Sequence, residues 1–395
     1  MKILHTSDWH LGQNFMGKSR EEEHNSFLTW LLEIIENKNI NVLIVAGDIF
    51  DTATPPNYAL ELYYNFLTKL SLSSCDNIII TAGNHDSIAT LKAPKQLLQA
   101  LNIHVITSGD KNENEVIKIF NQKKLEGIIC AVPFLRDYVV RQAMSSETLN
   151  DKEYLLSQGI KEHYKNVYKE ARKLLNGKEI PIIATGHLTT VGSKTSESER
   201  EIYIGGRLDI DSDFLGKYFD YVALGHLHIN QKVGSEHIRY SGSPIPLSFS
   251  ESTSQKKVNI VEFENKVIKV VELEIPLYRR LLALRGDVNS ILKDFENIKD
   301  KNTWIEVHLS DDNPFYANQI IRDKAQELEL ILLAVKIDKT EKILLTEDVN
   351  VISLDELNPL DIFHQRIEKD ELEDKDFVKE LVLNFKQIVN EVQNS

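Results

Sequence analysis

Carboxylate, amide and imidazole side chains gather in five short segments, which contain the residues best suited to chemistry. They are Asp8-Trp9-His10, Gly47-Asp48-Ile49-Phe50-Asp51, Gly83-Asn84-His85-Asp86, Gly186-His187 and Gly225-His226-Leu227-His228. Oxygen and nitrogen ligands of this kind fit Mn²⁺, Fe²⁺ or Zn²⁺, whereas a soft-metal site would need thiolates. The five segments therefore predict a metal centre, and we expect it to bind Mn²⁺.

Each segment directly follows a run of apolar, often β-branched residues, which is typical of a buried strand bounded by Gly, Asn and Asp. The runs span residues 2–6, 41–46, 77–82, 181–185 and 221–224. In an open α/β sheet, sites form in the crevice outside the carboxyl ends of the strands. We therefore expect one buried sheet to bring all five segments to a single edge.

A pair of divalent cations about 3.5–4 Å apart would suit these ligands, because such a pair clamps a phosphoester for in-line displacement and lowers the pKa of a water. A carboxylate with two oxygens can bridge the two ions, and Asp48 is the candidate for that position. Asp8 and His10 would share one ion, because alternate residues at a strand end point to the same side.

The remaining ligands come from the later segments. His226 and His228 repeat the alternate spacing of Asp8 and His10. Asn84 and His187 would complete the shell of the second ion with a neutral oxygen and a nitrogen. The predicted metal ligands are therefore Asp8, His10, Asp48, Asn84, His187, His226 and His228.

Two further residues are predicted to act without binding metal. The leaving alkoxide needs a proton, and His85 is the natural general acid because it follows the ligand Asn84 but points elsewhere along the turn. Asp51, three residues after Asp48, would hold the imidazole of His85 in the useful tautomer. We therefore predict His85 and Asp51 as the catalytic residues.

Composition is typical of a globular protein of two or three domains. The chain has 395 residues, with 42% hydrophobic and 27% charged residues and a net charge of −14. Residues 341–395 carry 14 acidic and 6 basic side chains, so the rest of the chain is only modestly acidic and can still bind phosphate through cations. Two cysteines, the lack of a membrane-length apolar run and an N-terminus that opens into a strand favour a cytoplasmic protein.

The pattern along the chain predicts three parts. Residues 1–275 alternate strands with helices, and Glu21 to Asn37 and Asn57 to Leu70 have the helical apolar period. The alternation restarts after Pro276, so residues 276–340 are predicted to form a second, small α/β unit. Residues 341–395 are predicted to be an acidic linker followed by helices with an apolar stripe that binds a partner.

Charged and polar residues outside the five segments are expected to have structural or surface roles. We expect the polar stretch from Ser193 to Arg200 to form a loop near the site, and His5 and His104 to pack within strands. Scattered basic residues are usually solvated, although some could reach phosphates: Lys18, Arg20, Arg279, Arg280 and Arg285. The histidines expected at the surface are His24, His163, His237, His308 and His364.

Taken together, the motifs resemble those of the calcineurin-like metallophosphoesterases. More narrowly, the chain is similar over nearly its whole length to the nucleases of that superfamily that work with a coiled-coil ATPase of the SbcC type. The resemblance is carried by residues 7–12, 47–52, 186–206 and 241–244. It implies an α/β fold in which a β-sandwich is flanked by helices, followed by a small α/β capping domain that contacts DNA and a C-terminal helical tail that binds the partner.

The same resemblance implies site roles and an activity. Asp8, His10, Asp48 and His228 would hold one metal, Asp48, Asn84, His187 and His226 would hold the other, and His85 would assist cleavage. Related nucleases are Mn²⁺-dependent, degrade double-strand ends and cut single strands and hairpins, in DNA repair, recombination and replication. The resemblance also implies ATP gating by the partner and a homodimer within a heterotetramer. Consistent with this, the chain has no P-loop motif.

Two other functions fit part of the pattern. The metal motifs alone also suit a phosphatase or a cyclic-nucleotide phosphodiesterase. A small substrate, however, would need neither the second α/β unit nor the polar loop that ends with Ser198-Glu199-Arg200. A non-catalytic scaffold for an ATPase would need neither the complete ligand set nor His85. The sequence therefore favours a nuclease.

Overall fold

The computed structural model of the chain describes residues 1–109, 111–136, 149–196, 198–199, 209–264, 267–311 and 314–337. The chain divides into two units, Met1–Asp338 and Lys339–Ser395. The predicted acidic tail of residues 341–395 lies outside the described residues.

The first sheet has six strands, four of them parallel to one another. Its order is β16-β15-β1-β4-β5-β6, and β1, β4, β5 and β6 form the parallel part. An antiparallel hairpin closes one edge, as the sequence predicted for the last two strands. The bounds are β1 (Lys2–Thr6), β4 (Val42–Ala46), β5 (Asn77–Thr81), β6 (Ile103–Ile106), β15 (Lys257–Glu264) and β16 (Val267–Glu274).

A second six-stranded sheet corrects the prediction of one sheet. Its order is β13-β14-β12-β9-β8-β7, and β14, β12, β9 and β8 run parallel. The expected strands before His187 and His226 belong to this sheet, because apolar periodicity identifies a strand but not the sheet that it joins. The bounds are β7 (Val116–Asn121), β8 (Lys124–Cys130), β9 (Ile182–His187), β12 (Tyr221–Gly225), β13 (Gln231–Val233) and β14 (Ser235–Tyr240).

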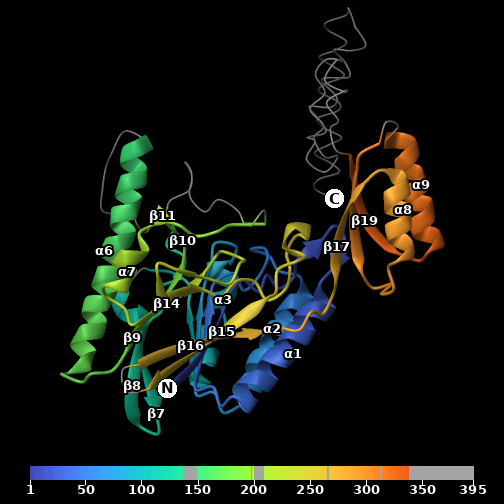
Figure 1. Cartoon of the computed structure of the whole chain (residues 1–395). Coiled ribbons are helices and arrows are strands. Elements are labelled where there is room, and N and C mark those ends of the chain that lie inside the picture. The colour runs from blue at the N-terminus through green and yellow to red at the C-terminus, as the bar shows by residue number, and fades with distance from the viewer. Residues whose placement is uncertain are drawn as a thin grey trace, which may run out of the picture. The chain divides into compact units, whose positions relative to one another are not determined.

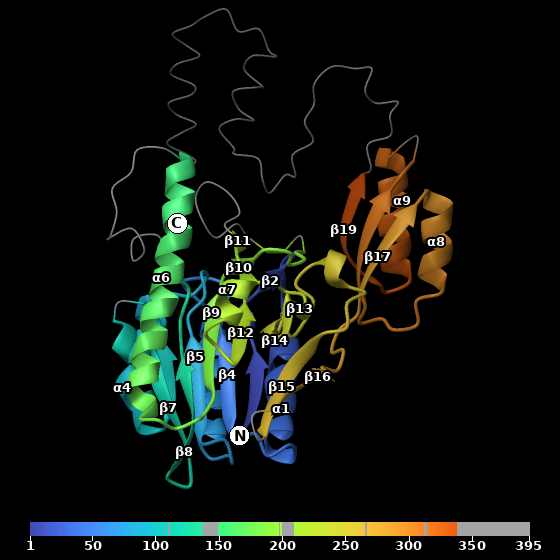
Figure 2. The ribbon, with the colours of Figure 1, turned by 60° about the vertical axis from the view of Figure 1, so that its left-hand side comes forward.

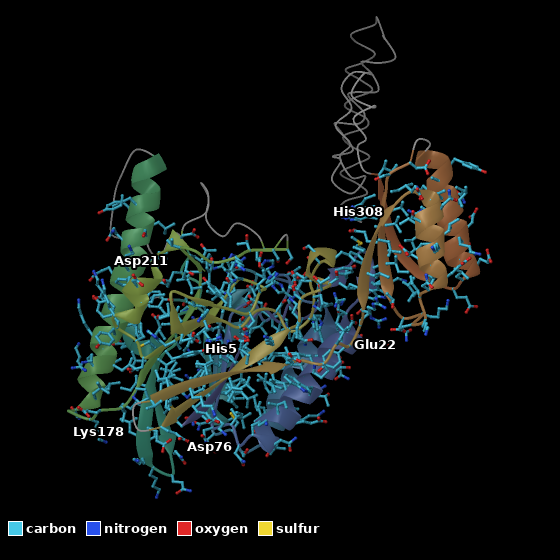
Figure 3. The ribbon with its side chains drawn as sticks, viewed as in Figure 1. His5, Glu22, Asp76, Lys178, Asp211 and His308 are labelled. Carbon is cyan, nitrogen blue, oxygen red and sulfur yellow. The ribbon has the colours of Figure 1, made fainter. Side chains whose placement is uncertain are left out.

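The two sheets pack face to face through a shared apolar core. Ile44 and Ile79 of the first sheet contribute to one buried cluster with Ile129 and Ile183 of the second. His5 of β1 adds a polar link, with Nδ1 3.0 Å from the Tyr221 hydroxyl and Nε2 3.1 Å from a carbonyl oxygen of β12, and it lies in the interior in Figure 3. Burial of both inner faces explains why these strands are almost continuously apolar.

Helices cover the outer face of each sheet (Figure 1, Figure 2). On the first sheet, α1 (Glu21–Asn37) and α2 (Asn57–Leu70) keep their predicted bounds and bury an apolar stripe that includes Phe27, Leu31 and Ile35. On the second sheet, α6 (Leu149–Leu175) and α7 (Ser212–Gly216) share one buried cluster with the strands. The sandwich flanked by helices is therefore confirmed.

Two short helices follow the loop after β5. The helix α3 (Ile88–Lys92) ends before Pro94, and α4 (Lys95–Ala100) begins after it. Proline lacks the amide hydrogen that a helix interior needs, so it separates the two. Short elements without a detectable period went unpredicted: β2 (Asn14–Phe15), β3 (Lys18–Ser19), β10 (Thr189–Thr190), β11 (Asp209–Ile210), and the 3₁₀ turns η1 (Asn112–Glu115) and η2 (Phe249–Glu251).

A smaller sheet unit follows the hairpin. Three parallel strands, in the order β17-β18-β19, carry α8 and α9 on one face (Figure 1). The other face places Leu281 and Trp304 in a buried cluster with Phe15 and Phe249 of the main sandwich. The bounds are β17 (Leu281–Gly286), α8 (Val288–Glu296), β18 (Trp304–Leu309), α9 (Pro314–Glu327) and β19 (Ile331–Ile337).

The strands that precede the five motif segments begin at one end of the molecule. Asp76, just before β5, and Lys178, shortly before β9, both lie along the lower edge of the view in Figure 3. Parallel strands of both sheets therefore end at the opposite side, where their polar segments follow. Among the described residues, no helix is long and apolar enough to cross a membrane.

Candidate metal centre

The loops that follow β1 and β4 are tied together by main-chain hydrogen bonds. The amide of Asp8 donates to the carbonyl of Gly47 at 3.0 Å, and the amide of His10 donates to the carbonyl of Asp48 at 3.1 Å. The amide of His226, from the second sheet, donates to the Asp8 carboxylate at 2.9 Å. Loops from both sheets therefore meet at one place.

Four of the predicted ligands have a left-handed backbone. The φ angles are 52° at Asp8, 47° at His10, 50° at Asp48 and 95° at His226. Such conformations cost residues with a Cβ of order 1–3 kcal/mol each and persist only where the surroundings impose them. Their concentration at the ends of three strands indicates that side-chain direction is fixed there at the expense of local backbone energy.

Two glycines allow the loops to approach this closely. Gly47 has a φ of +90°, and a Cβ there would lie 2.2 Å from Nδ1 of His187. A Cβ on Gly83 would lie 2.1 Å from Oδ1 of Asp48. Both distances are far below van der Waals contact, so the glycines of these two segments are required by packing against candidate ligands.

Asp8, His10 and His228 form the first cluster of candidate ligand atoms. One ligand atom of each lies within 4.8 Å of the others, and all three residues are buried. The rings of His10 and His228 have centroids 5.2 Å apart. Nε2 of His10 is buried, none of the described residues offers it a hydrogen bond, and the nearest Asp48 oxygen lies 3.6 Å away. A buried nitrogen in this state fits a metal ligand.

Asp8, Asp48 and His187 form a second cluster that overlaps the first. Nε2 of His187 lies 3.3 Å from Oδ2 of Asp48 and 2.9 Å from Oδ1 of Asn84. Nδ1 of His187 lies 3.1 Å from the carbonyl oxygen of Ala46, so that nitrogen carries the proton and Nε2 faces the carboxylates. The His226 ring lies beside it, with centroids 5.3 Å apart. Asp8 belongs to both clusters, and Oδ2 of Asp48 lies between His10 of the first cluster and His187 of the second.

The buried carboxylates of the two candidate ligand clusters require nearby positive charge. Burial, together with repulsion from Asp48, raises the pKa of Asp8 to about 7, although His187 and His10 oppose this shift. The pKa of Asp48 is lowered despite its burial, because His187 and His10 stabilise its charge, and Asp48 in turn overcomes burial to raise the pKa of His187 to about 9. Two buried carboxylates that depend on protons for compensation fit a site for divalent cations.

The candidate ligands His226 and His228 are held in the neutral form. Burial lowers the pKa of His226 well below its usual value, and nearby His187 adds to the shift. Burial also lowers the pKa of His228 to about 4, although Glu251 opposes this. Neutral imidazole is the form that binds metal. The donor set of carboxylate oxygens, an amide oxygen and imidazole nitrogens therefore fits two divalent cations.

His85 and Asp51 lie beside the clusters, but their contact differs from the predicted one. Nδ1 of His85 donates to the main-chain carbonyl of Asp51 at 2.7 Å, while the Asp51 carboxylate accepts from Nδ1 of His10 at 3.1 Å. The rings of His10 and His85 have centroids 4.9 Å apart. Asp51 thus hydrogen-bonds to His85 through its backbone, while its carboxylate hydrogen-bonds to the predicted ligand His10 and lies within 4.8 Å of a ring nitrogen of His85.

Asp86 ends one of the five segments, but its role was not predicted from the sequence. Its buried carboxylate accepts hydrogen bonds from the amides of Gly83 at 2.8 Å, Phe50 at 3.0 Å and Ile49 at 3.2 Å. Those bonds join the segment that contains Asp48 to the segment that contains Asn84. Its position three residues after a strand-end glycine was the only sequence signal for this function.

Two glutamates near His228 were also missed. Glu199 accepts a hydrogen bond from the amide of His228 at 2.8 Å. Glu251 lies 3.5 Å from Nδ1 of the same histidine and is buried. Glu199 is in the polar stretch that was expected near the site, whereas nothing in the local sequence marks Glu251.

Several expectations about other charged residues are wrong. His24 is fully buried beneath the site rather than exposed. Arg20 is also buried, pairs with Glu23 at 2.7 Å and cannot reach solvent phosphates, while Arg279 pairs with Glu22 at 2.9 Å. These residues lie in helix-terminal or loop contexts, where sequence alone does not reveal burial. Arg280 and Arg285 are exposed, as expected.

Comparison with protein families gives two matches. Residues 1–230, which contain all the predicted ligands, match the calcineurin-like phosphoesterase family. Residues 277–371 match a family described as the type 5 capsule protein repressor C-terminal domain. The metal-centre region and the small sheet unit therefore each have relatives.

Curated relatives match most of the chain. The SbcD subunit of the nuclease SbcCD from Escherichia coli K12 is 38% identical over 95% of this chain and 94% of that protein. The protein of the same name from Bacillus subtilis is 33% identical, over 78% of this chain and 79% of its own length. Another, from Rhodobacter capsulatus, is 32% identical over 72% and 71% of the respective chains.

Proposed function

Because the chain belongs to the calcineurin-like phosphoesterases, and within them to the family of the SbcD subunit of the nuclease SbcCD, we propose that it is the nuclease subunit of an SbcC–SbcD complex that hydrolyses DNA phosphodiesters. The observation that supports this most strongly is the meeting of carboxylates and imidazoles from both sheets around Asp8 and Asp48. We assign domain 1–275 to catalysis, domain 276–340 to capping the DNA, and residues 341–395 to partner binding.

The proposed metal ligands fall into two sets that share Asp48. One divalent cation would be held by Asp8, His10, Asp48 and His228, and the other by Asp48, Asn84, His187 and His226. When bound, two such cations supply Lewis-acid activation of the phosphoester and lower the pKa of a water. Mn²⁺ is the proposed metal, since mixed nitrogen and oxygen ligands without thiolate suit it.

His85 is the proposed proton donor to the leaving oxygen. The carbonyl of Asp51 can only accept a hydrogen bond, so Nδ1 of His85 carries a proton that stays on the protein. Nε2 is then the atom that exchanges a proton with the substrate. The Asp48 carboxylate also accepts from the amide of His85 at 2.9 Å, which fixes the turn beside a proposed ligand.

A large substrate is favoured by the small sheet unit. Trp304 of β18 packs on Phe15, which lies shortly after the ligand His10, with ring centroids 5.5 Å apart. A small phosphoester would need no such unit beside the metal loops, whereas DNA would contact both. The exposed Arg280 and Arg285 on this unit are the proposed phosphate contacts.

The cellular activity follows from the family. We propose Mn²⁺-dependent exonuclease action on double-strand ends and endonuclease action on single strands and hairpins, in repair, recombination and replication. The partners would be a coiled-coil ATPase of the SbcC type, which gates the site with ATP, and a second copy of this chain in a heterotetramer. The proposed location is the cytoplasm, at the nucleoid.

A hairpin-DNA cleavage assay tests this function. Wild type and the His85→Leu variant are compared with Mn²⁺ or Mg²⁺, with and without the ATPase and ATP. Cleavage by wild type with Mn²⁺, its loss in the variant and its stimulation by the partner with ATP are expected. Turnover of a small phosphodiester equal to that of DNA, with no affinity for DNA, would instead identify a phosphatase. A lack of cleavage of any DNA would indicate a non-catalytic scaffold for the ATPase.

A further inference from the structure

Behind the candidate ligand His228 lies a buried carboxylate from a distant part of the chain. Glu251 ends the turn η2, 23 positions after the histidine, and its side chain is 1% exposed. Its oxygens accept hydrogen bonds from the Leu247 amide at 3.1 Å, the Ser196 hydroxyl at 3.0 Å and the Ser198 hydroxyl. A buried charge with this many donors has one fixed orientation.

Ser198 connects this carboxylate to His228. The hydroxyl oxygen of Ser198 lies 2.5 Å from Nδ1 of His228. Because its hydroxyl proton is donated to Glu251, the serine oxygen accepts from the imidazole, so Nδ1 carries the proton. The remaining nitrogen, Nε2, is left unprotonated for the cluster that also contains Asp8 and His10. The carboxylate and serine thus select the tautomer that can bind a metal.

A buried lysine balances the charge of Glu251. Nζ of Lys256 lies 2.5 Å from Oε2 of Glu251, and it also donates to the Ser243 hydroxyl at 2.8 Å and to the carbonyl of His228 at 3.1 Å. All three ammonium protons therefore have acceptors. The lysine contacts the same histidine from its backbone side, so the pair holds both the main chain and the ring of His228.

The turn that contains Glu251 is anchored on the small sheet unit. Phe249, two residues earlier in η2, packs 5.3 Å from the Phe15 ring centroid and shares a buried cluster with Leu281 and Trp304. Trp304 stacks on Phe15, and the guanidinium of Arg20 lies 5.3 Å from the centroid of Trp304. A displacement of the small unit would therefore act on the turn that holds Glu251.

Two other candidate histidine ligands are oriented by groups in or next to the segment that contains Asp48. Nδ1 of His10 faces Asp51, and Nδ1 of His187 faces the carbonyl of Ala46, which ends β4. Only for His228, among these three, does the orienting group come from an element that packs on the small unit. This difference gives one of the two proposed metal sites a separate mechanical connection.

We propose that Glu251, acting through Ser198 and balanced by Lys256, is a positioning residue for His228, and that η2 couples the affinity of one metal site to the seating of the small sheet unit. This inference rests on the proposed metal centre. It assigns to the unit an effect on metal binding that is separate from contact with DNA.

Mn²⁺ binding to the full chain tests the positioning role without relying on cleavage. Affinities and stoichiometry are measured by titration calorimetry and by the electron paramagnetic resonance signal of free Mn²⁺. Ser198→Ala, which leaves no charge unpaired, is expected to weaken one site by about 10- to 100-fold while the other changes little. Ser198→Thr, which keeps the hydroxyl, should restore the affinity, and Ser193→Ala, in the same polar stretch, is the control.

Glu251 itself is tested with its charge partner. Glu251→Gln alone leaves Lys256 buried without a counter-ion, so the double variant Glu251→Gln with Lys256→Met is included to keep the fold. Both variants, checked for folding by circular dichroism, should lose affinity at the same site as Ser198→Ala. Unchanged affinity at both sites in the folded Ser198→Ala and double variants would overturn the positioning role.

The coupling is tested by a double-mutant cycle. Trp304→Leu should weaken the same Mn²⁺ site, with no further loss when it is combined with Ser198→Ala. Phe295→Leu, in the helix-facing core of the small unit, controls for destabilisation of that unit alone. Additive losses, or no effect of Trp304→Leu, would overturn the coupling. If wild type itself bound no Mn²⁺, the proposed metal centre would be wrong. If every variant kept two intact sites, only the positioning and coupling roles would be wrong.

Discussion

Replacement of Asp51 distinguishes the two histidines that it contacts. The carboxylate accepts from Nδ1 of His10 at 3.1 Å, whereas the main-chain carbonyl accepts from Nδ1 of His85 at 2.7 Å. A side-chain substitution therefore removes the group that orients the proposed ligand and leaves the carbonyl that orients the proposed acid. Metal affinity and proton transfer should respond differently.

The expected size of the effect follows from these contacts. Asp51→Ala removes the carboxylate partner of His10, which should weaken one Mn²⁺ site by about 10- to 100-fold, or about 1.4–2.7 kcal/mol. Asp51→Asn keeps an oxygen that can accept from Nδ1 but loses the negative charge, so its loss should be smaller, about 3- to 10-fold. The side chain is 22% exposed, so neither change leaves a large cavity.

The assay is a Mn²⁺ titration followed both by calorimetry and by hairpin cleavage. Higher Mn²⁺ should restore the kcat of Asp51→Ala to within about 3-fold of wild type, because the His85 contact is retained. Glu262→Ala is the control, since that carboxylate has a similar exposure of 25% and pairs with Lys2 away from the site. Normal Mn²⁺ affinity with a kcat that excess Mn²⁺ does not restore would refute the reasoning and return Asp51 to the role of orienting His85.

Four other outcomes are expected. His85→Leu should retain bound Mn²⁺ but lose about 10²- to 10⁴-fold in cleavage rate, and loss of the metals would contradict its assignment as a non-ligand. Asp48→Ala should lower the Mn²⁺ content measured by atomic absorption, so normal occupancy would exclude a bridging carboxylate. Truncation before Asp376 should weaken pull-down of the ATPase partner and spare cleavage by the isolated chain, whereas unchanged pull-down would argue against a partner-binding tail. Burial lowers the pKa of His5 to about 3, so as pH falls below about 6.5 this histidine is protonated in the unfolded state but not in the folded one. The free energy of unfolding should therefore drop by about 2 kcal/mol by about pH 5. Urea unfolding of the His5→Leu variant should show a correspondingly smaller drop.

Local pattern was sufficient to predict most elements and the cluster of candidate ligands. Apolar runs followed by Gly, Asp or Asn identify β1 and β4 to within a residue, and the helical period gives the bounds of α1. The assignment of strands to two sheets was beyond such reasoning, because β9 and β12 have the same apolar character as β4 and differ only in their neighbours. Sheet membership depends on long-range pairing, which apolar period does not encode.

The same limit applies within the site. Residues that follow a strand end could be proposed as ligands from their type and position. The groups that orient these residues could not be identified in the same way. Glu251, for example, is separated from His228 in the sequence by β13 and β14 and comes close to it only in the folded chain. The division of Asp51 between a carboxylate contact and a carbonyl contact depends on the turn geometry around β4, which residue types do not specify. The choice of candidate ligands therefore rests on local sequence, whereas their orientation depends on tertiary structure.

Backbone strain at the ligands explains why so much tertiary structure surrounds them. Four left-handed residues, at order 1–3 kcal/mol each, together with two buried carboxylates, make the metal-free loops locally unfavourable. The hydrogen bonds between the loops after β1, β4 and β5, and the packing of both sheets behind them, offset that cost. These contacts fix the positions of the proposed ligand side chains. Because the proposed ligands depend on these supports, a displacement of η2 would be expected to alter metal binding, as the proposed coupling to the small sheet unit requires.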